Sequence, residues 1–464
     1  MISGTKLFGT NGVRGVFGRD LTLDLVIDLS YSLATFYRTG PIVVGRDGRN
    51  SSQIVSQVVI SSLNSAGLEV ANAGLIPTPC LQLAAKQLGY NGGIMITASH
   101  NPGEFNGIKP SAADGVEISR EDESTVESIY FSKQFSKIDG TCSEFHDDRI
   151  ISSYIDNVIE LVDIEKIQKR RFVIAIDPGN GVQTTVAPVL AKRLGCRVVT
   201  ANSTIDGTFP ARGSEPLLDN LNTLSCIVKG TKADIGVAYD GDGDRSIFCD
   251  EKGVIHPGDK TAASIVGYLL RTKHRGANVV CPINTTMAVS KVVDEAGSKV
   301  IHTKIGSVEV SREMIKTKSI VGLEENGGFM YGKLNEVRDG VMTTALVLDM
   351  LASENQTLSA LLASLPKVFQ YKAKFKCDKS TASKVVRVCM EHGSFRELQT
   401  LDGAKIWIDS ETWIMVRPSG TEPLVRMYAE STDKMLLDSK VREYRRLIES
   451  TIKKCQPFEN RQHF

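Results

Sequence analysis

The sequence predicts an α/β protein made of three similar domains with mixed or mostly parallel sheets, followed by a C-terminal α+β domain. The chain has 464 residues, which is enough for three or four domains of ordinary size. A unit of short apolar strands alternating with amphipathic stretches occurs three times between residues 41 and 324. After Pro366 the pattern changes, and the remaining elements do not repeat this unit.

The first copy of the unit begins at Pro41. A strand is expected at residues 42–44 and a helix over residues 54–63, where apolar residues recur at helical spacing. Further strands are expected at residues 68–71 and 93–96. The last of these leads directly into a polar loop.

The next two copies follow the same plan. The second is expected to have strands at residues 172–176, 197–200 and 235–239, with a helix that ends at Leu194. The third is expected to have strands at residues 278–281, 299–302 and 319–321, with helices that begin near Thr286 and Val308. Strands alternating with helices form parallel sheets, and ligands gather at the carboxyl ends of such strands.

The last domain follows an α+β pattern. Its expected elements are strands at residues 405–409, 412–416 and 424–429, with helices over residues 381–391 and 434–453. We place the four domains at residues 1–152, 153–253, 254–367 and 368–464.

Composition narrows the classes of partner and the cellular compartment. The chain has 55 Lys+Arg against 54 Asp+Glu, so no basic surplus favours nucleic acid or an anionic membrane as a partner. The nine Cys form no CxxC pair, which is typical of reduced thiols. The N-terminus lacks the apolar core of a signal peptide, and we expect a cytoplasmic protein. The sequence leaves open whether the chain forms a homo-oligomer.

Three carboxylates stand two residues apart in Asp240-Gly241-Asp242-Gly243-Asp244-Arg245. The glycines let the backbone curl, so that all three carboxylates can face one hard divalent cation. A solvated acidic turn is one alternative, and a calcium EF-hand is another, because Glu251 occupies the twelfth position. An EF-hand requires Gly where Arg245 stands and helices where this sequence has strands. The pattern therefore favours Mg²⁺ shared with a phosphate oxygen.

The string Thr97-Ala98-Ser99-His100-Asn101-Pro102 places a hydroxyl on a turn directly after a buried strand. Alone, it could be an ordinary Asn-Pro turn in which Ser99 is a cap and His100 a surface residue. Together with the acidic loop it suggests another role. A phosphate on Ser99 would be a stored phosphoryl group whose charge the cation and Lys109 neutralise.

Two further loops suit a phosphorylated sugar. Arg417-Pro418-Ser419-Gly420-Thr421 combines a guanidinium, two hydroxyls and a flexible backbone, which are the parts of a phosphate cradle, and Arg426 adds a second cation. The alternative is a simple Pro-Ser-Gly turn. Residues 323–328 place two acids and an amide, Glu324, Glu325 and Asn326, at a strand end, where they can bond sugar hydroxyls.

With these motifs the sequence resembles the α-D-phosphohexomutases, most closely the archaeal-type phosphoglucosamine, phosphomanno- and phosphoglucomutases. The resemblance runs from Phe8-Gly9-Thr10-Asn11-Gly12-Val13-Arg14-Gly15 to the Arg417 loop, with four signature loops in order. It implies four domains around a central cleft and an intramolecular phosphotransferase that acts on small hexose phosphates. It also implies one Mg²⁺ per chain and a hexose 1,6-bisphosphate as activator.

The resemblance assigns roles to individual residues. At the reacting phosphate it implies the catalytic residues Ser99, His100, Lys109 and Arg14. For Mg²⁺ it implies Ser99, Asp240, Asp242 and Asp244, with Arg245 beside them. For the substrate it implies Lys304, Glu324, Asn326, Arg417, Ser419, Gly420, Thr421 and Arg426. Some members have a His where this chain has Gly328, so any acid/base role of that His falls to His100 or Lys109.

We expect the enzyme to interconvert hexose 6-phosphate and hexose 1-phosphate through a phosphoserine and a 1,6-bisphosphate. Glucosamine phosphate is the favoured substrate, and a phosphomannomutase/phosphoglucomutase is the alternative. The adjacent acids Glu324 and Glu325 could favour an ammonium group at C2. Two rivals from other classes are a metal-dependent sugar phosphatase, which would release inorganic phosphate, and a non-catalytic sugar-phosphate sensor, which would need neither Ser99 nor the acidic loop.

Overall fold

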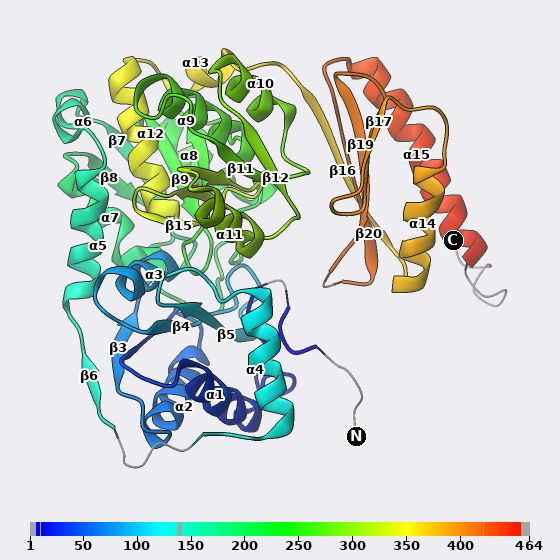
Figure 1. Ribbon diagram of the computed structural model, residues 1–464. Helices are drawn as coiled ribbons and strands as arrows, with labels where there is room; N and C mark the ends of the chain where they lie inside the picture. Colours follow the sequence, from blue (N-terminus) through cyan, green and yellow to red (C-terminus); the bar gives the residue numbers. More distant parts are fainter. Residues whose placement is uncertain (1–5, 10, 137–141, 421, 456–464) are drawn as a thin grey trace.

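The structure, a computed structural model, describes residues 6–9, 11–136, 142–420 and 422–455. Four β-sheets follow one another along the chain, and each forms the centre of one domain (Figure 1). The first three sheets contain parallel and antiparallel strands, and the fourth is antiparallel throughout. The predicted fold class, three α/β domains with mixed sheets and a C-terminal α+β domain, is confirmed.

Domain I has a six-stranded sheet in the order β1-β5-β4-β2-β3-β6. Its strands are β1 (Val13–Val16), β2 (Ile42–Arg46), β3 (Val70–Leu75), β4 (Gly92–Ile96), β5 (Phe105–Ala112) and β6 (Glu144–His146). Its helices are α1 (Leu23–Tyr37), α2 (Ser52–Ser65), α3 (Thr78–Gln87) and α4 (Arg120–Ser132). Helix α5 (Arg149–Glu160) follows and packs against α3. β4, β2, β3 and β6 are parallel, whereas β5 is antiparallel to β4.

Domains II and III vary the same plan. Domain II has the order β10-β9-β7-β8 and contains α6 (Ile164–Arg170), β7 (Val173–Asp177), α7 (Ala187–Arg193), β8 (Arg197–Thr200), α8 (Asn222–Thr231), β9 (Ile235–Tyr239) and β10 (Ser246–Asp250). Domain III has the order β12-β11-β13-β14-β15 and contains α9 (Gly258–Thr272), β11 (Val279–Pro282), α10 (Met287–Glu295), β12 (Val300–Thr303), α11 (Ser307–Thr317), β13 (Val321–Leu323), β14 (Phe329–Tyr331), β15 (Asn335–Arg338), α12 (Gly340–Glu354) and α13 (Leu358–Ala363).

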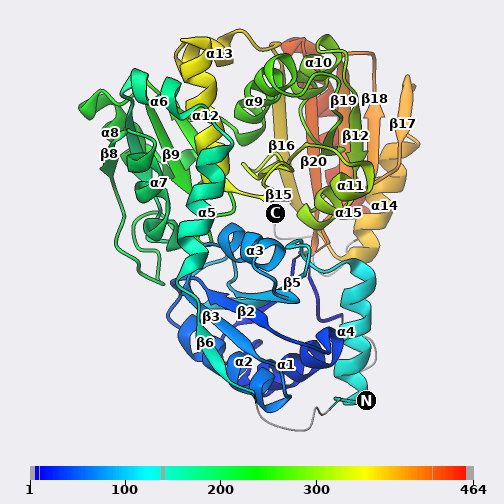
Figure 2. The same ribbon diagram turned by 60° about the vertical axis from the view of Figure 1, so that its left-hand side comes forward.

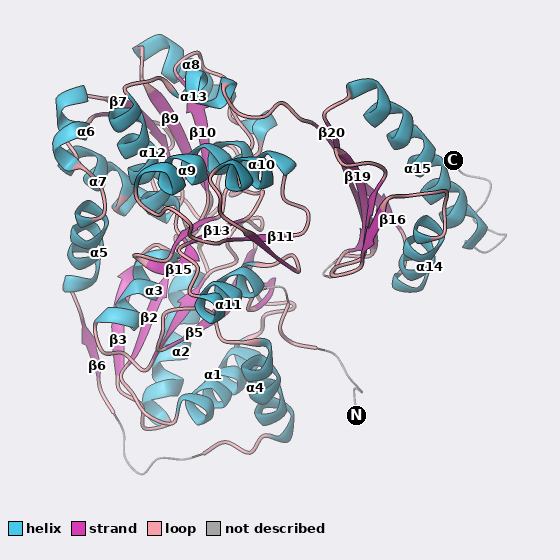
Figure 3. Ribbon diagram, turned by 45° about the horizontal axis from the view of Figure 1, so that its top comes forward, coloured by secondary structure: helices cyan, strands magenta, loops and turns pink. Residues whose placement is uncertain are grey.

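The C-terminal domain has the order β16-β20-β19-β18-β17. Its elements are β16 (Phe369–Lys376), α14 (Lys379–Met390), β17 (Glu397–Gln399), β18 (Ala404–Trp407), β19 (Thr412–Pro418), β20 (Leu424–Ser431) and α15 (Lys434–Cys455). Figure 3 shows α14 and α15 on the face of this sheet that is turned away from the other domains. The opposite face is therefore free to contact domain III.

The repeated plan gives three loops the same place in their domains. In each of the first three sheets, one parallel strand is followed by a neighbour that returns antiparallel: β4 by β5, β9 by β10, and β13 by β14. The intervening loops are residues 97–104, 240–245 and 324–328. These are the three polar loops found in the sequence, and each lies at the carboxyl end of a parallel strand.

The buried apolar residues show how the domains are joined. One core cluster extends without a break from Val43 in domain I to Leu362 in domain III. The C-terminal domain has a separate core, and a small cluster that includes Ile283, Met287 and Trp413 connects it to domain III. In the view of Figure 2 the C-terminal sheet overlaps domain III, and Lys405 Nζ of β18 donates to Ile283 O of domain III at 2.7 Å. The fourth domain is thus joined to the rest through a limited contact area.

The placed boundaries at 152/153, 253/254 and 367/368 stay a prediction, and α5 runs across the first of them. Among the described residues, the helices are all too short or too polar to cross a membrane.

Glu430 is a buried acid between domain III and the C-terminal domain. It is 1% exposed, and its Oε1 accepts hydrogen bonds from Thr286 Oγ1 and from Met287 N, both at 2.9 Å. Burial raises its pKa from 4.5 to about 7, against the lowering effect of those two bonds, and nearby Asp259 raises it further. The folded protein therefore holds this proton more tightly than the unfolded chain does.

We expect Glu430→Gln to remove a pH dependence of stability. A raised pKa in the folded state means that the free energy of unfolding falls as pH rises from 4.5 to about 7. The loss is up to about 3 kcal/mol. The Gln variant should lack this decline in urea denaturation at pH 5 and pH 8, whereas the control Glu449→Gln on α15 should keep it. Equal pH dependence in wild type and Glu430→Gln would contradict the assignment.

Candidate active site

Ser99 lies on the loop after β4, in a conformation that the surrounding residues hold in place. It is fully buried, and its φ of 51° is in the left-handed region, which is unusual for a residue with a side chain. Its backbone N donates to Thr97 Oγ1 at 2.8 Å. Buried Arg49 donates to Ser99 O at 2.7 Å and to Asn101 O at 2.6 Å, and Asp47 pairs with Arg49 Nε at 2.9 Å. The hydroxyl is therefore presented by a rigid loop.

The hydroxyl of Ser99 meets the acidic loop of domain II. Ser99 Oγ donates to Asp240 Oδ2 at 2.9 Å. Asp240, Asp242 and Asp244 are all buried, and one oxygen from each lies within 4.8 Å of the others. Burial first, and then the neighbouring charges of Asp244 and Asp242, raise the pKa of Asp240 well above its usual range. A cation bound among these groups would offset both the burial of the Asp240 carboxylate and its repulsion by Asp244 and Asp242.

The free oxygens of this cluster fit a divalent cation. Asp242 Oδ1 and Asp244 Oδ1 are buried and have no hydrogen-bond partner among the described residues. The second oxygen of each is already occupied: Thr78 Oγ1 donates to Asp242 Oδ2 at 2.6 Å, and Lys109 Nζ donates to Asp244 Oδ2 at 3.2 Å. Hard carboxylate oxygens of this kind are the ligands that Mg²⁺ prefers.

We expect Asp242→Asn to weaken Mg²⁺ binding by about tenfold, because a neutral amide attracts the cation less than a carboxylate does. Isothermal titration with MgCl₂ measures this directly, and activity against Mg²⁺ concentration measures it again. Asp438→Asn on the surface of α15 is the matched control. Full activity of the wild type in excess EDTA would exclude a metal at this cluster.

Cationic groups surround the hydroxyl and the acids. Arg14 donates to Ala98 O at 3.1 Å and to Asn101 Oδ1 at 3.2 Å, and burial lowers its pKa to about 10. Lys109 is 3% exposed; burial lowers its pKa, but Glu117 and Asp244, each 3.2 Å away, outweigh this and leave the pKa raised. The charge on Lys109 is thereby maintained at neutral pH.

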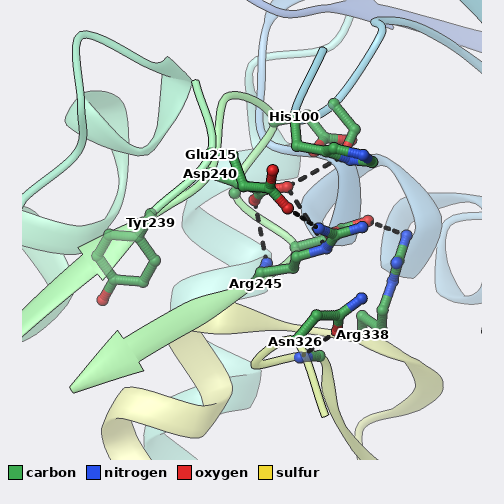
Figure 4. Close-up of polar contacts among 12 residues, drawn as sticks. His100, Glu215, Tyr239, Asp240, Arg245, Asn326 and Arg338 are labelled. Carbon is green, nitrogen blue, oxygen red and sulfur yellow. Dashed lines mark hydrogen bonds and ion pairs between the residues drawn. The ribbon is translucent and has the colours of Figure 1, made fainter. Parts of the chain in front are cut away.

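His100 stays uncharged in this setting. The nearby charge of Arg245, then burial, and then Arg14 and Arg338 lower its pKa to about 2. Its Nδ1 is buried without a partner among the described residues. Figure 4 shows Asp240 and Arg245 between His100 on one side and Asn326 and Arg338 on the other. The arrangement suits an anion bearing several oxygens.

The sugar-loop acids are both paired with cations. Glu324 Oε2 accepts from Arg338 NH1 at 3.2 Å, and Glu325 Oε2 lies 2.5 Å from Lys372 Nζ of β16. Asn326 Oδ1 accepts from Gly328 N at 3.2 Å. Lys304 is exposed on the loop after β12. The loop thus combines an oriented carboxylate and an amide, as hydrogen-bonding to hydroxyls requires.

The cradle lies where β19 turns into β20. Arg417 and Arg426 are directly paired across these strands, so their side chains leave the same face of the sheet. Arg417 Nε pairs with Asp402 Oδ1 at 3.2 Å, and Arg426 NH2 pairs with Glu422 Oε2 at 2.7 Å. Ser419 N donates to Leu424 O at 2.9 Å, and Gly420 has open space around it. Thr421 lies outside the described residues.

Sequence reasoning missed several residues that hold these groups. They are Asp47, Arg49, Thr78, Glu117, Arg338 and Asp402. The string Arg46-Asp47-Gly48-Arg49 had a usable signal, because it is a charged turn at the end of a parallel strand. Thr78 carries no local signal, since its partner Asp242 lies far away in the chain. Arg338 begins a similar string, Arg338-Asp339-Gly340, but the strand before it was not expected from the sequence.

Comparisons with known proteins cover nearly the whole chain. Family models match all four parts: phosphoglucomutase/phosphomannomutase α/β/α domain I at residues 5–137, domain II at 152–253, domain III at 257–369, and the C-terminal domain at 378–445. The chain is 39% identical to a phosphoglucosamine/phosphogalactosamine mutase of Sulfurisphaera tokodaii, covering 96% of this chain and 99% of that one.

Two further relatives agree with this. A phosphoglucomutase/phosphomannomutase of Thermococcus kodakarensis is 38% identical over 95% of this chain and 96% of its own. The crystal structure of a phosphoglucomutase/phosphomannomutase family protein from Burkholderia thailandensis has a TM-score of 0.86 and 26% identity, covering 96% of this chain and 97% of that one.

Proposed function

The chain belongs to the phosphoglucomutase/phosphomannomutase family, and we propose that this phosphohexomutase converts glucosamine 6-phosphate to glucosamine 1-phosphate through a phosphoserine at Ser99. The observation that carries the proposal is the bond of 2.9 Å between Ser99 Oγ and Asp240 Oδ2. It places a buried hydroxyl at a cluster of three carboxylates, with Arg14, Lys109 and Arg245 nearby. Phosphoryl transfer depends mainly on such alignment and charge.

The proposed reaction has two phosphoryl transfers. In the first, the bond between Ser99 Oγ and phosphorus breaks and a bond from the free substrate hydroxyl to phosphorus forms. The proton lost by that hydroxyl and the proton gained by Ser99 Oγ pass through His100 or Lys109. The resulting 1,6-bisphosphate turns end for end and returns its other phosphate to Ser99. Free hexose 1,6-bisphosphate therefore serves as an activator that restores the phosphoserine.

The residues have separate duties in this cycle. Asp240, Asp242 and Asp244 would hold Mg²⁺ together with a phosphate oxygen of Ser99, and the ion would supply charge stabilisation. Arg14, Lys109 and Arg245 neutralise the phosphoryl oxygens. Arg417, Ser419, Gly420, Thr421 and Arg426 bind the phosphate that does not react, and Lys304, Glu324 and Asn326 contact the sugar.

The intact mass of the purified protein tests the covalent intermediate. A mass that exceeds the sequence by one phosphate, localised to Ser99 by peptide mapping, is the expected result. A phosphatase would release inorganic phosphate in proportion to substrate consumed, whereas a mutase releases almost none. A sensor would show no turnover at all.

Support for glucosamine comes from named relatives. A protein of Sulfurisphaera tokodaii named phosphoglucosamine/phosphogalactosamine mutase is 39% identical to this chain, and one of Methanococcoides burtonii named "probable phosphoglucosamine mutase" is 35% identical. The idea that Glu324 and Glu325 attract an ammonium group loses support, because Arg338 and Lys372 already neutralise them. A phosphomannomutase/phosphoglucomutase is the alternative, as in the 38% identical relative.

We expect kcat/KM for glucosamine 1-phosphate to equal or exceed the values for mannose and glucose 1-phosphates. The three sugars share their C3 and C4 hydroxyls and differ at C2, so the differences should be modest. All three are measured on one preparation with the matching bisphosphate present. A glucosamine value clearly below either of the others would overturn the substrate assignment while leaving the phosphoserine chemistry intact.

A further inference from the structure

Arg338, the last residue of β15, joins two loops of the site. It is 5% exposed, and its NH2 lies 2.6 Å from Asp244 Oδ2 in the acidic loop. Its NH1 lies 3.2 Å from Glu324 Oε2 in the sugar loop. Burial lowers the pKa of Arg338, but Asp244 and Glu324 outweigh that effect and raise it above its usual range. The guanidinium is a permanent cation shared by two acids.

The path of this side chain depends on Gly328. A Cβ at Gly328 would lie 2.5 Å from Arg338 Cδ and 2.9 Å from Arg338 Cγ, which is closer than real Cβ contacts come. Both atoms belong to the middle of the side chain, so a methyl group there would push the whole guanidinium aside. The absence of a side chain at Gly328 is therefore what lets Arg338 reach both carboxylates.

The two ion pairs of Arg338 differ in length, 2.6 Å to Asp244 and 3.2 Å to Glu324. The bond to Asp244 is the shorter one, and Lys109 holds the same Oδ2 from another direction at 3.2 Å. Asp244 is thus a fixed anchor. Glu324 is held through Oε2 by the second arm of the fork, which leaves Oε1 for a substrate hydroxyl.

Resting on the proposed function, we propose that Arg338 is a positioning residue: anchored on Asp244, it orients Glu324 to read the sugar hydroxyls. A buried carboxylate bonded by a guanidinium has one preferred rotamer, so the hydroxyl-binding oxygen is placed before the sugar arrives. Without Arg338, Glu324 would have to be ordered by the substrate, and discrimination between hydroxyl and hydrogen would fall. The guanidinium reaches the two acids from different nitrogens, NH2 for Asp244 and NH1 for Glu324, and the single ammonium of a lysine has no such fork.

Binding measurements test this without turnover. In a Ser99→Ala background with Mg²⁺ present, calorimetry compares glucose 6-phosphate with its 3-deoxy and 4-deoxy analogues. We expect the Ser99→Ala protein to bind glucose 6-phosphate about tenfold or more tightly than at least one of the deoxy analogues, and this ratio of affinities is the quantity compared between variants. Arg338→Gln and Arg338→Lys should reduce that ratio to about twofold or less.

Two further variants distinguish the position of the Arg338 guanidinium from its charge, and both from a general loss of structure. Gly328→Ala keeps the guanidinium but displaces it, so it should lose the ratio as Arg338→Gln does. Lys372→Gln removes the cation paired with the neighbouring Glu325 and should keep the ratio. Thermal unfolding identifies any variant that does not fold. The added Cβ of Gly328→Ala would also lie 3.2 Å from Asn326 Oδ1, so the ratio must be lost in Arg338→Gln as well as in Gly328→Ala.

A ratio that persists in Arg338→Gln or in Gly328→Ala overturns the inference even if the wild type isomerises hexose phosphates normally. Failure of the wild type to isomerise overturns the proposed function instead. If the Ser99→Ala protein binds no hexose phosphate at all, that result contradicts both the inference about Arg338 and the proposed function.

Discussion

Ser99→Ala is expected to lower mutase turnover by about a thousandfold or more. The hydroxyl is the proposed carrier of the phosphoryl group, and among the described residues it is Ser99 Oγ that donates to Asp240 Oδ2. Steady-state conversion of hexose 1-phosphate with a coupled assay measures the loss, and intact mass should show that the added phosphate has disappeared.

The fold should survive this change. The loop is held through the carbonyl of Ser99 by Arg49 and through its backbone N by Thr97, and alanine keeps both groups. Ser99→Gly, which accepts the φ of 51° without strain, should be equally inactive. Ser30→Ala, at a buried serine of α1, is the matched control and should turn over normally. Near-normal activity of Ser99→Ala would disprove the covalent mechanism.

Arg417→Ala is expected to lower kcat/KM by about tenfold to hundredfold, for hexose 1-phosphates and hexose 6-phosphates alike. Each charge-assisted hydrogen bond to phosphate contributes roughly 1.5 to 3 kcal/mol. Arg417 stands beside Arg426 across two paired strands, so the remaining guanidinium keeps part of the affinity.

The two directions of the reaction make this test specific. The cradle should hold the non-reacting phosphate whichever end of the sugar carries it, so both substrates should suffer by similar factors. Arg445→Ala, on α15 of the same domain, is the control for loss of a cation. If only one of the two substrates is affected, a cradle shared between both orientations is excluded.

Much of the fold was readable because its signals are local. The strands expected at residues 197–200 and 235–239 are present as β8 and β9. A short apolar run bounded by polar turns can be identified as a strand from its own residues. Elements such as β14 and β15 were missed, because they are short, three and four residues, and their pairing partners decide them.

The polar loops could be predicted individually, because each lies next to its own strand. That the loops come together in one site could not be predicted. The bond from Ser99 to Asp240 spans 141 residues, and that from Lys109 to Asp244 spans 135. Such contacts depend on how whole domains pack through a shared core.

The fold class and the positions of the four polar loops could be predicted from the sequence, since each loop is a short polar string at the end of an expected strand. Which groups contact one another depends on the tertiary structure. Nothing in the sequence indicates the contacts of Arg338. In the structure its side chain lies between Asp244 and Glu324 and packs over Gly328. A buried charge is stabilised by its partners, and partners far apart in the chain are brought together by the packing of the domains.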